Sequence, residues 1–127
     1  MPDVVQALDV AAARPELWRI TERRTFQELR RQGRRARRGP LTVTWMAPPV
    51  DGSPERTRAG FTIGRATGGA VVRNRVRRRL RAALRELLVG GHLAPGSYLL
   101  GGGAPLAEMP WSELMVLVRD TCDEARR

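Results

Sequence analysis

The most informative stretch of the sequence runs from Val72 to Val89 and reads VRNRVRRRLRAALRELLV. Its apolar residues recur every three or four positions, which is the spacing of an amphipathic helix with one side in a core. The members of this apolar stripe are Val72, Val76, Leu80, Ala83, Leu84 and Leu87. Two glycines, Gly90 and Gly91, then provide a natural end. The stretch therefore predicts one long helix, from about Val72 to Val89, with a buried stripe.

The other side of this helix is dominated by arginine. At about 100° per residue, four side chains fall together opposite the stripe, namely Asn74, Arg78, Arg81 and Arg85. Arg75 and Arg77 flank this row, whereas Arg73 and Arg79 lie near the stripe and are expected to extend outward along their aliphatic stems. Guanidinium groups bind phosphate oxygens at two points, and asparagine can hydrogen-bond a base or a 2′-hydroxyl. The helix is thus predicted to present a row of cations to an anionic partner.

The distribution of charge points to the same kind of partner. The 127 residues carry a formal charge of +10, and all 23 basic residues are arginine. Residues 19–38 hold nine Arg against two Glu, and residues 73–85 hold seven Arg and no acid, so each block has a net charge of +7. Two such blocks in one small domain repel themselves unless an anion neutralises them. Nucleic acid is the expected partner, because a membrane-surface helix would need Trp and Phe anchors that this narrow stripe lacks.

Several function classes are excluded by what the chain lacks. The single cysteine, Cys122, cannot form an intrachain disulfide or frame a zinc site, and the single histidine, His92, cannot build a His-based metal site. No run of about 18 apolar residues is present to span a membrane, and the acidic N-terminus does not fit a secretory signal. We therefore expect a cytoplasmic protein with no catalytic residue, no metal site, no membrane partner and no disulfide-linked partner.

The rest of the chain predicts a single α+β domain. A first helix is expected from Thr21, as its N-cap, to Gly33, followed by a flexible run that includes Arg34 and Arg35. A last helix is expected to start at Pro110, with an inner face formed by Trp111, Leu114, Met115, Val118 and Cys122. Strands are expected at 41–47, 58–64 and 97–100. The predicted architecture is a single-domain α-β sandwich in the order α-β-β-(β)-α-β-α, with the bracketed strand optional.

Small residues mark a candidate groove on the predicted sheet. The outward faces of the strands at 41–47 and 58–64 carry Thr42, Thr44, Gly60, Thr62 and Gly64. Side chains of this size leave room for an open, shallow groove. Ordinary solvent exposure of a half-buried antiparallel sheet explains the same pattern equally well.

Three segments together resemble a known family. Residues 70–81, AVVRNRVRRRLR, closely resemble the Arg-Asn-Arg motif of the bacterial ribonuclease P protein component. The run Arg19-Ile20-Thr21, followed by Phe26 and Gly33, is similar to the family's opening helix, and residues 59–65 resemble the strand before the motif. The resemblance covers residues 18–127, and it leaves residues 1–17 as an N-terminal extension that we expect to be flexible.

This resemblance implies both a fold and a function. The family's fold contains a left-handed β-α-β crossover. Its members are protein subunits of a ribonucleoprotein that removes 5′ leaders from precursor tRNA, in which the large RNA carries the active site and binds the Mg²⁺ ions. We therefore expect an endonuclease component with two partners, ribonuclease P RNA and precursor tRNA. The protein alone is expected to be inactive.

The same resemblance implies two sets of binding residues. The set that faces the RNA subunit comprises Arg73, Asn74, Arg75, Arg77, Arg78 and Arg81. The set in the cleft for the single-stranded leader comprises Phe26, Arg30, Thr44, Thr62 and Arg65. The chain departs from the family at Gly64-Arg65-Ala66, where a Ser-Lys-Lys run is usual, and at Arg30, where an aromatic residue is common. At position 30 the guanidinium group of arginine would then replace the aromatic ring, by stacking on a base or by ion pairing.

Two other RNA-binding classes compete with this interpretation. A basic RNA-binding protein without an enzymatic role, such as a ribosomal protein, has the same composition, and only the motif separates the two. An RNA-recognition-motif domain needs several aromatic residues to stack bases. In this chain the corresponding strand, at 58–64, offers only Phe61, and the alternation places Phe61 on the core side.

Overall fold

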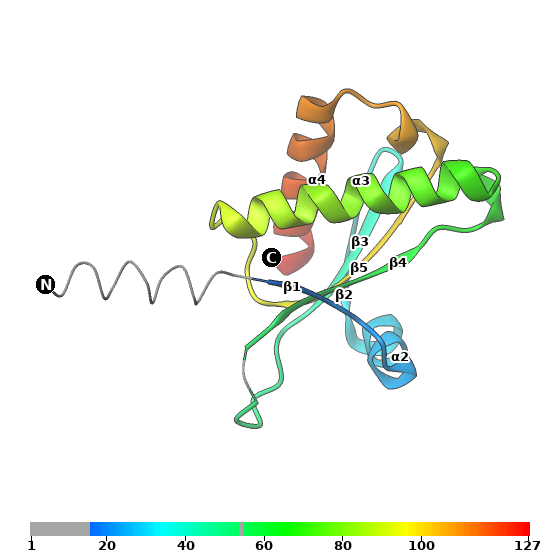
Figure 1. Cartoon of the computed structure of the whole chain (residues 1–127). Coiled ribbons are helices and arrows are strands. Elements are labelled where there is room, and N and C mark those ends of the chain that lie inside the picture. The colour runs from blue at the N-terminus through cyan, green and yellow to red at the C-terminus, as the bar shows by residue number, and fades with distance from the viewer. Residues whose placement is uncertain (1–15, 54) are drawn as a thin grey trace, which may run out of the picture.

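The computed structural model describes residues 16–53 and 55–127, which form a five-stranded mixed sheet with helices on both faces (Figure 1). The strands are β1 (Leu17–Arg19), β2 (Arg34–Arg38), β3 (Leu41–Met46), β4 (Thr57–Thr62) and β5 (Gly96–Gly102). The helices are α2 (Arg23–Gln32), α3 (Ala70–Val89) and α4 (Trp111–Arg126), with short 3₁₀ turns η1 (Arg65–Thr67) and η2 (Ala104–Ala107). The sheet order is β1-β4-β5-β3-β2.

Alternation along the strands divides the core into two parts. In β5, Tyr98 and Leu100 point into the larger core under α3 and α4, whereas Leu99 between them points to the other face. There it packs with Ile20 and Leu29 beneath α2. The sheet is therefore sandwiched, with α3 and α4 on one face and α2 on the other (Figure 1).

Helix α3 connects two strands that lie side by side. Strands β4 and β5 are parallel neighbours, and the chain passes from one to the other through α3. Parallel neighbours cannot be joined by a tight turn, so a crossover of this kind is required. The predicted stripe of α3 is buried against the sheet, with Val76, Leu80 and Leu84 completely inaccessible. The α+β class and the single sheet predicted from the sequence are confirmed.

The arginines after Gly33 are the main correction to the predicted elements. Arg34 and Arg35 open strand β2, which pairs antiparallel with β3, so this segment is not the flexible run that the sequence suggested. Gly39 has a φ of 52° in the tight turn that joins the two strands, a conformation that favours glycine. Between exposed arginines, Ala36 is the single buried residue of β2. One small apolar residue in five is too weak a pattern to predict a strand.

The first helix also begins later than expected. Its N-cap is Glu22 and not Thr21, and no side chain caps it. The reason lies in strand β1, which pairs parallel with β4 and extends that pairing to a hydrogen bond from the Ile20 N–H to the Ala59 carbonyl, 3.0 Å long. This pairing keeps the chain extended up to the helix. Gly33 ends α2 as predicted.

At the amino-terminal end, the expected extension at residues 1–17 lies outside the described residues, apart from Glu16 and Leu17. Leu17 is the first residue of β1. No helix in the described part of the chain is long and apolar enough to cross a membrane.

A glycine beneath α2 gives a stability prediction. A Cβ atom on Gly60 would lie 2.7 Å from Cε1 of the Phe26 ring, so Gly60→Ala forces the ring out of its place against the sheet. Overpacking of this kind costs about 1–3 kcal/mol, which we expect as a lower free energy of unfolding in urea.

The matched control is Gly64→Ala, because a Cβ atom there meets nothing within 4 Å. This control should unfold like the original chain, and adding Phe26→Leu to Gly60→Ala should restore part of the loss. Equal stability of the two alanine variants would contradict this packing.

Candidate nucleic-acid interface

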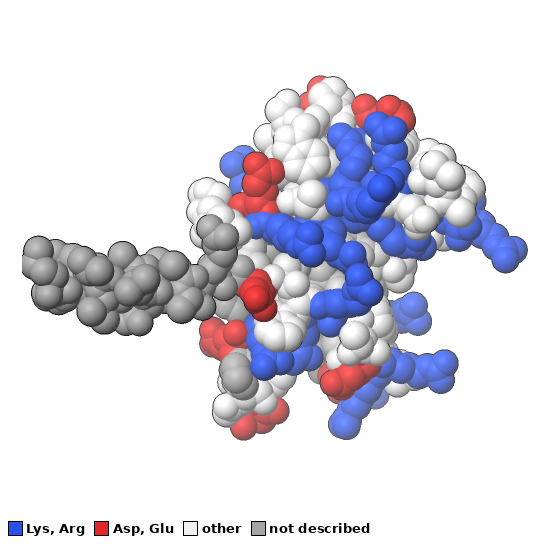
Figure 2. Space-filling model, in the orientation of Figure 1, with Lys and Arg blue, Asp and Glu red and all other residues white. Residues whose placement is uncertain are grey.

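The predicted RNA-facing side chains all lie on α3, but they differ in their exposure and in their hydrogen-bond partners. Asn74, Arg75 and Arg78 are exposed, whereas Arg73, Arg77 and Arg81 are half-buried along the edges of the stripe. Figure 2 shows basic side chains in a band across the face of the molecule that α3 occupies in Figure 1. Asn74 and Arg78 are exposed opposite the stripe, as the periodicity predicted, but Arg81, which was expected beside them, lies half-buried at the edge of the stripe over the sheet. Their role in binding RNA stays a prediction.

Arg77 fixes the orientation of Asn74. One guanidinium nitrogen of Arg77 donates to Oδ1 of Asn74 at 2.9 Å, and the other donates to the Ile63 carbonyl at 3.3 Å. Because the amide oxygen of Asn74 accepts this bond, its NH₂ group is left to donate outward. The pair therefore presents hydrogen-bond donors, which is the chemistry that phosphate oxygens require.

The Arg75 side chain has an exchangeable partner. Its guanidinium lies 3.5 Å from a carboxylate oxygen of Glu108, and the two side chains are 51% and 78% exposed. An ion pair this exposed contributes little to stability, so a phosphate can replace the carboxylate at small cost. Arg78 forms no hydrogen bond or ion pair within the described residues.

Arg79 corrects one expectation of the sequence. Instead of extending outward, its guanidinium turns toward η2, where it donates to the Leu106 carbonyl at 2.6 Å and to the Met109 carbonyl. It also lies 5.9 Å from the ring centre of Trp111, which is 38% exposed and is not on the inner face of α4 as predicted. Arg79 therefore anchors the segment before α4 to α3 and is a structural residue.

Arg81 lies over an aromatic ring of the sheet. Its guanidinium carbon is 5.1 Å from the ring centre of Phe61, in a cation–π contact. Burial lowers the pKa of the Arg81 guanidinium, and the charges of Arg19 and Arg85 lower it further. The group stays protonated, because an arginine does not lose its charge in a protein.

A second basic feature, the α2 groove, lies on the opposite face of the sheet. It has a volume of about 400 Å³ and is bounded by α2, β2, β3, β4 and β5. The lining residues are Leu29, Arg30, Gly33, Arg35, Thr42, Thr44, Thr62, Leu99 and Gly101. This lining holds two guanidinium groups, three threonine hydroxyls and no carboxylate.

Three of the five predicted cleft residues line this groove. They are Arg30, Thr44 and Thr62. Phe26 instead packs against Gly60 beside the groove, and Arg65 is exposed in η1 outside its lining. The sequence interpretation missed Arg35, which reaches the groove because β2 is a strand paired with β3. It also missed Gly101.

The groove floor requires glycine at one position. A Cβ atom on Gly101 would lie 2.9 Å from Oγ1 of Thr42 and 3.1 Å from Oγ1 of Thr62. The Thr42 hydroxyl donates to the Gly101 carbonyl at 3.2 Å, which fixes this part of the floor. A side chain at position 101 would therefore crowd both threonines, so glycine keeps this part of the groove open.

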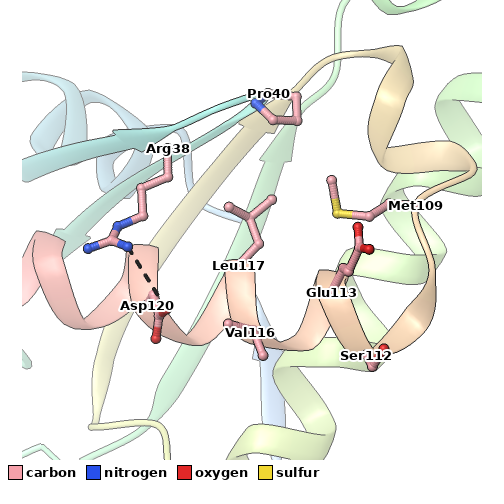
Figure 3. A pocket seen from close by; sticks show the side chains of 8 residues that line it. All are labelled: Arg38, Pro40, Met109, Ser112, Glu113, Val116, Leu117 and Asp120. Atoms are coloured by element: carbon pink, nitrogen blue, oxygen red, sulfur yellow. Dashed lines mark ion pairs between the residues drawn. The ribbon is translucent and has the colours of Figure 1, made fainter.

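A third hollow, of about 510 Å³, lies between the β2–β3 turn and α4 (Figure 3). Met109, Val116 and Leu117 give it an apolar floor, and Arg38 forms an ion pair at 3.9 Å with Asp120 at its edge. Asp120 and Glu113 place two carboxylates in the lining. Their charge makes this hollow unsuited to a nucleic-acid backbone.

The described residues offer little chemistry for catalysis. No group of three or more His, Cys, Asp or Glu side chains among them is placed to hold a metal ion. Burial raises the pKa of Cys122 to about 12, so the thiol is protonated and unreactive at neutral pH. Arginine side chains are available on both faces of the sheet, on α3 and in the lining of the α2 groove.

Comparisons with known proteins support one family. The family model described as Ribonuclease P matches residues 15–125. The ribonuclease P protein component of Thermobifida fusca is 40% identical over 101 residues, which are 76% of this chain and 67% of that protein. The component from Streptomyces avermitilis is 40% identical over 92 residues, which are 68% and 73% of the two chains.

A solved structure shares the fold at low sequence identity. The RNase P protein of Staphylococcus aureus aligns with a TM-score of 0.71 over 87% of this chain and 97% of that chain, at 17% identity. This likeness shows a common arrangement of the sheet and helices.

Neighbouring arginines of α3 should differ sharply in their effect on stability. Arg79→Ala removes two hydrogen bonds from a charged donor and should lower the free energy of unfolding by about 1–3 kcal/mol. Arg78→Ala removes an exposed side chain and should change it by less than about 0.5 kcal/mol. Urea unfolding of both variants measures the difference. If Arg78→Ala destabilises the protein as much as Arg79→Ala, the anchoring role of Arg79 is refuted.

Proposed function

The chain belongs to the ribonuclease P protein family as a protein component of ribonuclease P, and we propose that it works there by holding two RNA strands on opposite faces of its sheet. The RNA subunit lies along α3, and the 5′ leader of precursor tRNA lies in the α2 groove. The observation that carries this proposal is the separation of two basic surfaces by one sheet. A single bound strand would need only one of them.

The contact with the RNA subunit rests on the exposed side of α3. Asn74, Arg75 and Arg78 are accessible there, and the ion pair at Arg75 is weak enough to yield to a phosphate. The buried stripe fixes the helix backbone, so the positions from which these donors project are set before RNA arrives. A fixed array of donors loses less conformational entropy on binding than a flexible one.

The contact with the leader rests on the lining of the α2 groove. Arg30 and Arg35 supply charge, while Thr42, Thr44 and Thr62 supply hydroxyls that donate to or accept from a ribose or phosphate. With no carboxylate in the lining, nothing repels a polyanion.

The proposed division of labour leaves the chemistry to the RNA subunit. When bound there, Mg²⁺ supplies an activated water for hydrolysis of the phosphodiester. The protein neutralises the repulsion between two RNAs and positions the leader, so that its contribution is binding and orientation. The alternative of a ribosomal protein has no observation in its favour beyond basic composition.

Reconstitution with ribonuclease P RNA and a precursor tRNA tests this division. Counterions can replace much of what the protein does, so we expect the RNA alone to cleave at high Mg²⁺ and the protein to stimulate most at low Mg²⁺ and moderate salt. Cleavage rates over a Mg²⁺ titration give the measurement. Metal-dependent cleavage by RNA-free protein, or no stimulation under any ionic condition, would contradict the proposal.

The proposal that the α2 groove binds the leader can be tested by varying the length of the leader. Thr62→Glu places a negative charge in the groove and should weaken binding of a precursor with a long leader by about fivefold, since two like charges 4 Å apart in water repel by about 1 kcal/mol. Binding of a precursor with a one-nucleotide leader should change little. Affinities for both substrates are measured with the assembled ribonucleoprotein.

Ser112→Glu is the matched control for this test. It adds the same charge at an exposed position on α4, across the sheet from the groove. It should reduce affinity equally for long and short leaders, if at all. A penalty from Thr62→Glu that does not depend on leader length would place the leader elsewhere.

A further inference from the structure

Three arginines that form no ion pair within the described residues lie near one another at the carboxyl-terminal half of α3. Arg81 and Arg85 lie one turn apart on the same side of the helix, and Arg19 extends from strand β1 beside it. Arg19 and Arg85 line a common depression, the β1 groove, together with Glu16, Leu17, Leu88 and Val89. Its volume is about 400 Å³.

The sheet topology brings these arginines together. Strand β1 joins the edge of the sheet by parallel pairing with β4, which places Arg19 opposite Ala59. Helix α3 crosses over this edge and contacts β1. Residues 19 and 85 are far apart in the sequence, so the sequence alone gives no sign of their proximity.

No counter-charge within the described residues neutralises this cluster. The ion pairs of the structure involve other arginines, and none of them joins a carboxylate to Arg19, Arg81 or Arg85. Glu16 is the single carboxylate in the lining of the β1 groove, and it lies beyond ion-pair distance of both arginines there. Like charges four residues apart on a helix are destabilising, so the cluster is maintained at a cost to the folded protein.

The pKa of Arg81 reflects the proximity of the other two guanidinium groups. Burial lowers the pKa of Arg81, and the charges of Arg19 and Arg85 lower it further. Arg81 is additionally fixed over Phe61 by its cation–π contact of 5.1 Å. The cluster therefore has a rigid centre with two exposed guanidinium groups around it.

We propose that Arg19 and Arg85, beside Arg81 of the predicted RNA-facing set, form a phosphate-binding site for the backbone of the RNA subunit that extends this set toward the carboxyl-terminal end of α3. The proposal rests on the function proposed above. Arg73 and Arg85 are about 18 Å apart along the helix at 1.5 Å per residue, so the RNA contacts the whole length of α3. The β1 groove is exposed to solvent at Arg19 and Arg85, so a phosphate can reach both guanidinium groups.

The test compares two pairs of arginines that carry the same charge. Arg19→Ala with Arg85→Ala removes two predicted phosphate contacts, while Arg31→Ala with Arg127→Ala removes two exposed arginines elsewhere. Each contact contributes about 0.7–0.9 to the slope of log K against log salt. We expect the first pair to reduce that slope by about 1.4–1.8 and to weaken binding of ribonuclease P RNA at least tenfold at moderate salt. The second pair should change both quantities much less.

Two further variants complete the experiment: a double substitution by lysine, and a cysteine that carries a cleavage reagent. Arg19→Lys with Arg85→Lys keeps the charge and should restore most of the slope. Cys122 is buried and is the single cysteine of the chain, so Arg85→Cys creates one reactive thiol to which an iron chelate can be attached. Radicals from that position should cleave the bound RNA at a defined site, whereas the same chelate on Arg127→Cys should not.

Each outcome bears on the proposal. Equal loss of affinity from both alanine pairs, or an unchanged slope with no cleavage from position 85, would overturn it while leaving the proposed function intact. Failure of the unaltered protein to bind ribonuclease P RNA would instead refute the proposed function, and this site with it. Unfolding curves of the variants confirm that the exposed substitutions leave the fold unchanged.

Discussion

The basic face of this protein depends on the burial of one stripe of α3. Val76, Leu80 and Leu84 are completely buried against the sheet, and this contact fixes the rotation of the helix about its own axis. A rotation by one residue would move every guanidinium group by about 100° and would place some of them in the core. The packing of a few aliphatic side chains therefore determines which cations face the solvent and which, like Arg79, turn back into the structure.

Basic and acidic residues are concentrated on different elements of the protein. Arginines are concentrated on α3 and around the α2 groove, whereas α4 carries most of the acidic residues of the second half of the chain. Two of these, Asp120 and Glu124, lie near Arg38 of the edge strand β2, at 3.9 and 3.4 Å. The acidic helix thus neutralises Arg38 of this basic strand, whereas Arg35 of the same strand lines the α2 groove. A partner that is itself a polyanion is thereby directed away from α4.

The sequence predicted those parts of the structure that rest on local periodicity. The long helix, its buried stripe and the strands at β3 and β4 follow from alternation that is visible in the residues themselves. Strand β2 escaped prediction because four of its five residues are arginine, and its strand character comes from pairing with β3. The Arg79 side chain was misplaced because its guanidinium bonds to the Leu106 carbonyl, 27 residues away in the sequence. Trp111 was misplaced because its ring lies beside that same guanidinium and not in the core. The meeting of Arg19 with Arg85 likewise requires the crossover, which no local pattern encodes.

The floor of the α2 groove has a consequence for the genes whose transcripts it is proposed to hold. Glycine and threonine offer hydroxyls and backbone atoms but no ring, and Arg30 and Arg35 would contact phosphates, or stack on bases, with little regard to sequence. Such a surface distinguishes strands by charge and flexibility and hardly by their bases. Upstream sequences of tRNA genes would then carry no consensus imposed by this protein, and they could drift by mutation without loss of processing.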